Sequence, residues 1–215
     1  ALPDLMSLFL PQRTADVLPR APLGPVPQQG TEEFELLFQT SAHGIGLVGH
    51  CELCFDGRTL TYGAYDPAHQ RLLRTVGAGI VFSAPREPYL RWCIGTHHRR
   101  VISYSLRLPP AQAAQLRAEL ERFRQTLSPW QPEALPEDCF AGRLRRLGGV
   151  RFWRVQRGPY ATYFIPTINC VSLTNKLLEK TDIGRTVMLG LKTPGAYLDL
   201  LEREYLAGNP AVTAR

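Results

Sequence analysis

Cysteine and histidine are the side chains in this sequence best suited to covalent and acid–base chemistry, and there are five of each. Cys170 follows Asn169 and precedes an apolar pattern with helical spacing, so we expect it at the start of a helix. Backbone N–H groups and the helix dipole at that position favour a thiolate and are suited to stabilise an oxyanion. Cys170 is therefore the candidate nucleophile. The alternative is that it is a small buried residue of the helix face that packs on a sheet.

His50 is the candidate base. It follows Gly49 at the start of a predicted strand, and a histidine on a strand is held rigidly, as a general base must be. A histidine on a half-buried strand can also be purely structural. The pair of His50 and Cys170 indicates nucleophilic catalysis more specifically than either residue alone.

Other motifs in the chain do not support a metal or cofactor site. Cys51 and Cys54 form a C-x-x-C, but on a strand this spacing sends the two side chains to opposite faces, which argues against zinc. His50-Cys51-Glu52 matches the H-x-E of zinc deaminases, yet the second thiolate is missing after Cys170. The sequence has no GxSxG, phosphate loop or Rossmann fingerprint. We therefore expect no metal and no cofactor.

The elements that must position the pair follow from turn residues and periodicity. Asp56-Gly57 predicts a tight hairpin between strands over 49–55 and 58–65. Further strands are expected over 34–40, 80–83, 100–108, 150–156 and 160–165. Helices are expected over 110–127, 170–180 and 195–206. Antiparallel hairpins with helices at separate positions predict an α+β domain.

Domain organisation follows from proline density and length. Residues 1–30 form a proline-rich N-terminal arm, because the prolines of 11–30 forbid a continuous helix or a central strand. The remaining chain, 31–215, is long enough for one domain with its own core. Hydrophobic residues make up 44% of the 215 residues, and no apolar run is long enough for a membrane span.

The net charge of +6 comes almost entirely from arginine. Six arginines fall in one stretch: Arg143, Arg145, Arg146, Arg151, Arg154 and Arg157. This stretch is either a surface for an anionic partner or a solvated face of an arginine-rich chain, and the second is the more usual behaviour of charge runs. Because no nucleic-acid-binding motif accompanies it, nucleic-acid binding is a minor alternative.

Two segments together resemble a known family. Residues 49–66 (GHCELCFDGRTLTYGAYD) place Gly-His at a strand start before a Tyr-Gly strand, and residues 169–178 (NCVSLTNKLL) place Asn-Cys at a helix start. They resemble the circularly permuted NlpC-type branch of the papain-like cysteine hydrolases, in which the histidine strand precedes the cysteine helix. The resemblance implies a papain-like antiparallel sheet packed against helices.

The resemblance also implies a third catalytic position on the strand after the histidine strand. Tyr62 occupies that place, with Asp66 and Glu52 as competitors. The hairpin register is open by one residue, and a shift of one residue changes the face. A Cys–His dyad without a third side chain therefore remains open.

The function implied by the resemblance is hydrolysis of an amide bond in peptidoglycan peptides. Members of the fold include bacterial cell-wall amidases delivered as toxins by type VI secretion. For this chain, that implies secretion or delivery to the bacterial periplasm, a cytoplasmic stage before export, and an immunity protein over the cleft. The alternatives are an acyltransferase or lipid/thioester hydrolase with the same pair, and a non-catalytic arginine-rich binding module.

Overall fold

The computed structural model describes residues 32–40, 49–72, 75–131, 136–137, 139–183, 193–209 and 211–214. Within these residues, an eight-stranded sheet has the order β10-β6-β1-β2-β3-β5-β8-β7, and β4 pairs with β9 in a two-stranded ribbon. Every pairing between these strands is antiparallel. The strands are β1 (Glu32–Thr40), β2 (His50–Phe55), β3 (Arg58–Gly63), β4 (Val76–Ala78), β5 (Ile80–Pro85), β6 (Arg100–Leu108), β7 (Leu127–Pro129), β8 (Arg151–Val155), β9 (Thr162–Phe164) and β10 (Val212–Ala214).

The hairpin between β2 and β3 turns at Asp56-Gly57, as the sequence predicts. Asp56 has φ 50° and Gly57 has φ 70°, so both central residues lie in the left-handed region that a tight type I′ turn requires. Phe55 pairs with Arg58 and Leu53 with Leu60. This register fixes which side chains of the two strands share a face.

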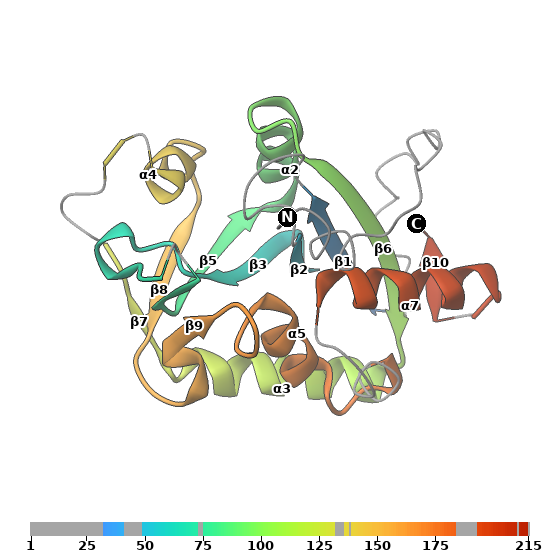
Figure 1. Cartoon of the computed structure of the whole chain (residues 1–215). Helices are drawn as coiled ribbons and strands as arrows, with labels where there is room; N and C mark the ends of the chain where they lie inside the picture. The colour runs from blue at the N-terminus through green and yellow to red at the C-terminus, as the bar shows by residue number, and fades with distance from the viewer. Residues whose placement is uncertain are drawn as a thin grey trace, which may run out of the picture.

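Helices cover both faces of the sheet (Figure 1). Helices α2 (Arg86–Gly95) and α4 (Phe140–Arg145) lie on one side, and α3 (Pro110–Arg124), α5 (Cys170–Leu178) and α7 (Pro194–Leu206) lie on the other. Short 3₁₀ helices, η2 (Pro67–His69) and η3 (Pro159–Ala161), occur in connecting segments. The architecture is therefore α+β with a large antiparallel sheet.

The two largest buried clusters of the described residues correspond to the two faces. One cluster combines Cys51 and Leu53 of β2 with Cys170 and Leu177 of α5, and α5 packs mainly against β2 and β3. The other combines residues of β5 with Tyr89 and Trp92 of α2 and with α4. Because alternate residues of a strand point to opposite faces, β2 sends side chains into both layers.

Several short elements differ from the sequence predictions. Helices α2 and α4 and strands β4, β7 and β10 were not expected, and the helix expected over 110–127 ends at Arg124 because Leu127 begins β7. The proline-rich arm over 1–30 lies outside the described residues. None of the described helices has the length and apolar character to cross a membrane.

Candidate active site

Cys170 is the first residue of α5, and its position is fixed by a capping box. The Asn169 side chain accepts a hydrogen bond from the Ser172 N–H at 3.0 Å, and the Ser172 hydroxyl accepts one from the Asn169 N–H at 2.9 Å. Such reciprocal capping satisfies backbone donors that a helix leaves unpaired at its start. The sequence prediction that Cys170 begins a helix is confirmed.

The sulfur of Cys170 meets the backbone of β2 beside His50. The Cys51 N–H donates a hydrogen bond to Sγ of Cys170 at 3.4 Å. One turn further along α5, Thr174 Oγ1 lies 3.9 Å from the Cys51 thiol. The start of α5 and the start of β2 are thus joined directly, although they are far apart in the sequence.

The Cys170 thiol is protonated at neutral pH. Burial raises its pKa to about 11, and the negative charge of Glu52 acts in the same direction. Hydrogen bonds from the backbone N–H groups of Cys51, Val171 and Cys170 itself lower the pKa, as expected at a helix start. Only 3% of Cys170 is exposed, so burial outweighs these N–H groups. The thiolate expected from the helix position is therefore not the resting form.

His50 is the first residue of β2, and its ring contacts the hydroxyl group of Tyr65. Nε2 of His50 lies 3.1 Å from the Tyr65 hydroxyl and 3.8 Å from Oε1 of Glu52. Burial, and to a smaller extent the positive charge of Arg99, lowers the pKa of His50 to about 3. The imidazole is consequently neutral at neutral pH, and a pKa this far below the operating pH makes it a weak base in the resting structure. Nδ1 has no hydrogen bond to a described residue.

The resting structure does not join the His50 ring to the Cys170 thiol. Within the described residues, no hydrogen bond links the two side chains. The side chains of β2 alternate: Cys51 points towards α5, whereas His50 and Glu52 share the opposite side of the strand. Cys170 contacts this end of β2 through the Cys51 amide, which is the peptide group that follows His50.

Tyr62 does not hold the His50 ring. Its hydroxyl donates to the carbonyl oxygens of Tyr160 at 2.9 Å and Thr162 at 3.3 Å. The hairpin register places Tyr62 on the same face as Leu60, towards α5 and away from the His50 ring. Tyr62 instead anchors the segment that leads into α5.

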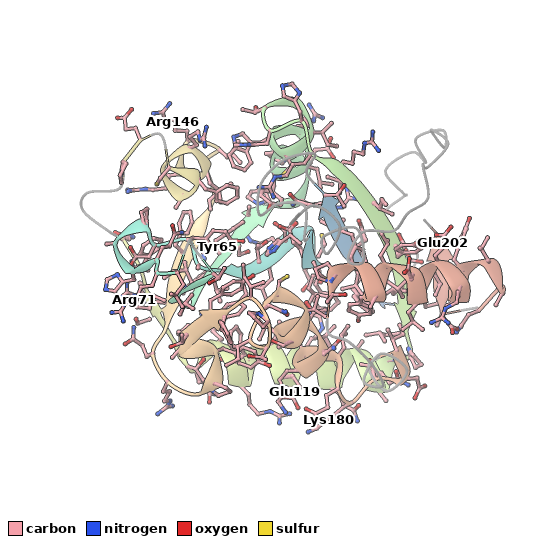
Figure 2. The ribbon with its side chains drawn as sticks, viewed as in Figure 1. Tyr65, Arg71, Glu119, Arg146, Lys180 and Glu202 are labelled. Atoms are coloured by element: carbon pink, nitrogen blue, oxygen red, sulfur yellow. The ribbon has the colours of Figure 1, made fainter. Side chains whose placement is uncertain are left out.

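Tyr65, which the sequence analysis did not select, makes the contact with the His50 ring that was expected of Tyr62, although the strand expected over 58–65 ends at Gly63. It follows the end of β3 and folds back over Gly63, where a Cβ would lie 2.7 Å from Cζ of the Tyr65 ring. The ring also stacks on Phe140 of α4, with centroids 5.2 Å apart. Figure 2 shows Tyr65 in the interior, away from Arg71, Arg146 and Glu202 at the rim. The sequence feature that goes with this arrangement is Gly63, two residues before Tyr65, because a residue without a side chain leaves room for the ring.

The two competing carboxylates have different surroundings. Asp66 accepts a hydrogen bond from the Ala68 N–H at 3.1 Å, lies 2.7 Å from Nδ1 of His69, and forms an ion pair with Arg154. Asp66 therefore serves to fix η2 against β8. Glu52 is fully buried and lies near the His50 ring.

The arginine-rich stretch is divided among several contacts. Arg154 pairs with Asp66 and Arg146 pairs with Glu137, whereas Arg151 and Arg157 are exposed. In the part of the chain that the structure describes, no group of three or more histidine, cysteine or acidic side chains is placed to hold a metal ion.

Comparison of the chain with protein-family models, with curated proteins and with solved structures gives no match.

Proposed function

We propose that this chain is a cysteine hydrolase in which the Cys170 thiol attacks an amide carbonyl and His50 acts as the base. The observation that carries the proposal is the hydrogen bond from the Cys51 N–H to Sγ of Cys170. It joins the start of α5 to the peptide group next to His50, so a nucleophile and a base come from two elements that meet. Cys139 also accepts a backbone N–H, from Gly142 at 3.3 Å, so what distinguishes Cys170 is that its donor is the peptide group next to His50.

The proton transfers follow from the neutral resting state of the pair. With Nε2 of His50 engaged by Tyr65, Nδ1 is the nitrogen suited to take the thiol proton. Because the His50 ring and the Cys170 thiol lie on opposite sides of β2 at rest, the proton transfer requires the side chain of His50, the first residue of the strand, to turn about the strand end towards Sγ when substrate binds. As sulfur bonds to the carbonyl carbon, backbone N–H groups at the start of α5 stabilise the oxyanion.

The second half of the reaction restores the enzyme. The imidazolium of His50 returns its proton to the leaving amine as the C–N bond breaks, which leaves an acyl thioester on Cys170. A water molecule, deprotonated by His50, then attacks the thioester carbonyl. The carboxylic acid leaves, and the proton returns to the sulfur.

The proposed substrate is an amide bond in peptidoglycan peptides. This part of the proposal, together with a papain-like arrangement of the fold, is supported by the resemblance of residues 49–66 and 169–178 to the permuted NlpC-type hydrolases. The enzyme would then act in the periplasm of a target bacterium, and a producing cell would need an immunity protein that covers the site.

Digestion of purified peptidoglycan tests the function directly. The wild type should release peptide fragments identifiable by mass spectrometry, and Cys170→Ala should release none. Cys139→Ser is the matched control, because the Cys139 side chain caps α4 by accepting from the Gly142 N–H, a role that serine fills well, and in the described part of the chain it has no hydrogen bond to His50 or Cys170.

An active and folded Cys170→Ala variant would overturn the proposal. Loss of activity in Cys51→Ser alone would move the nucleophile to the residue beside His50. Acyl transfer to an added amine or lipid acceptor, without release of acid, would show an acyltransferase with the same pair.

A further inference from the structure

Glu52 is a fully buried carboxyl group whose hydrogen bonds come from neutral donors. Gln39 of β1 donates to it at 2.8 Å, Thr61 of β3 donates at 3.2 Å, and Tyr89 of α2 donates through its hydroxyl. The nearby cation Arg99 reaches this group indirectly, by donating to Oε1 of Gln39 at 3.0 Å. Three elements therefore converge on one acidic side chain.

A carboxyl group in this position is unfavourable for packing alone. Burying an ionised carboxylate without a cation is costly, even where three neutral donors point at it. Within the described residues, the one ionisable nitrogen within 4 Å of the Glu52 carboxyl group is Nε2 of His50, at 3.8 Å, and the ring is uncharged at rest. Stability alone therefore does not explain why an acidic residue, Glu52, lies next to His50.

We propose that Glu52 is a positioning residue whose carboxylate stabilises the imidazolium that His50 forms when it takes the thiol proton. This inference rests on the proposed function of the His50 and Cys170 pair. The ring is largely buried, so a proton on it needs an opposite charge close by. Among the described acidic side chains, Glu52 is the one within 4 Å of the ring nitrogens.

The other groups that face Glu52 do not supply this charge. Tyr89 and Cys93 of α2, Tyr65 after β3 and Cys170 of α5 all have a raised pKa and are neutral at neutral pH. Arg99 is positive and opposes protonation of His50. Gln39 and Thr61 carry no charge. The imidazolium therefore depends on the ionised form of Glu52.

The ionisation of Glu52 falls in the neutral range. Burial raises its pKa to about 7, and the hydrogen bonds from Tyr89, Gln39 and Thr61 limit the rise. Activity should accordingly increase with pH through about 7, as the carboxylate forms. Removing one of the neutral donors should move this transition to higher pH, because the donors favour the charged form.

The test is the pH profile of kcat/KM for peptidoglycan hydrolysis by the wild type and three variants. For Glu52→Gln we expect a loss of about 10- to 100-fold above pH 8, with no transition near pH 7. Tyr89→Phe and Thr61→Val keep the carboxylate but remove a donor. They should retain the activity at high pH and shift the transition upward, even if Glu52→Gln folds poorly.

A merely structural role would lower the amount of folded enzyme and leave the midpoint of the profile unchanged. The inference is overturned if folded Glu52→Gln keeps the wild-type profile, or if neither donor variant shifts it, while Cys170→Ala remains inactive. That combination would leave the proposed function intact.

A measurement made without substrate also distinguishes a failure of this inference from a failure of the proposed function. The nitrogen chemical shifts of the His50 ring should change near pH 7 in the wild type, as Glu52 titrates beside it, and should not change in Glu52→Gln. No change in the folded wild type would overturn the inference. If these chemical shifts change near pH 7 but the protein does not hydrolyse peptidoglycan, Glu52 and His50 are coupled, and the role of Glu52 in the proposed reaction is overturned.

Discussion

The hydroxyl of Tyr65 lies 3.1 Å from Nε2 of His50, so the contact engages this ring nitrogen and leaves Nδ1 as the one available for chemistry. When Nε2 carries the ring proton it donates to the Tyr65 oxygen, and Nδ1 keeps its lone pair. Without this contact the imidazole would sample both tautomers and several orientations. The proposed base therefore depends on a tyrosine beyond the end of β3.

We predict that Tyr65→Phe lowers kcat/KM by about tenfold or more, since the ring loses its orienting hydrogen bond. The measurement is peptidoglycan hydrolysis by the purified variant at its optimum pH. The free energy of unfolding should fall by about 1–2 kcal/mol, because Nε2 of His50 loses this partner while the stacking of the residue 65 ring on Phe140 remains.

Tyr62→Phe is the matched control, since it removes a hydroxyl from a neighbouring tyrosine that does not contact His50. It should leave activity nearly intact but lower the free energy of unfolding by about 1–2 kcal/mol, because the carbonyls of Tyr160 and Thr162 lose their donor. If Tyr62→Phe were the inactive variant and Tyr65→Phe the active one, the assignment of the orienting residue would be wrong.

Gly63→Ala should displace the Tyr65 ring. A Cβ at residue 63 would lie 2.7 Å from that ring, which is too close for a van der Waals contact. We expect a loss of activity similar to that of Tyr65→Phe, together with a loss of about 1–3 kcal/mol in stability from overpacking. Gly95→Ala is the control, because a Cβ there meets no atom within 4 Å. Equal activity of Gly63→Ala and the wild type would show that the ring needs no such space.

The parts of the fold that the sequence predicted are those with strong local signals. Asp56-Gly57 requires a tight turn, and Asn169 is a good helix cap, so both the hairpin and the start of α5 were found correctly. Helix α2 was missed because its polar and apolar residues do not form a clear stripe. Strand β4 is too short for alternation to show.

The parts of the candidate site that the sequence could not give depend on tertiary contacts. Tyr62 and Tyr65 are both near Gly63 in the sequence, and the choice between them depends on the register of β2 and β3. The protonation of Cys170 depends on how deeply α5 is buried, whereas the sequence shows only that a helix begins there. Local electrostatics favoured a thiolate, and burial reversed that expectation.

Alkylation of Cys170 by iodoacetamide should be slow at neutral pH. Because the pKa of the thiol is about 11, the rate should rise by about tenfold per pH unit from pH 7 to 10. Mass spectrometry of the peptide that contains Cys170 measures this rate, and the same peptide in the unfolded protein gives the reference for an exposed thiol. A plateau below pH 8 in the folded protein would show that Cys170 and His50 form an ion pair at rest.

Glu52 should also make the stability of the protein depend on pH. Its pKa is about 7 in the folded state and 4.5 as the ordinary value, so between these pH values the folded state binds more protons than the unfolded state. The free energy of unfolding contributed by this group is therefore highest below pH 4.5 and falls as the pH rises through 7. Glu52→Gln lacks this titration and serves as the reference in which other groups cancel. Urea unfolding of both proteins from pH 4.5 to 8 should show the wild type losing about 3 kcal/mol relative to the variant. A constant difference across this range would show that the pKa of Glu52 is not raised by folding, and the transition expected in the activity profile would then have another origin.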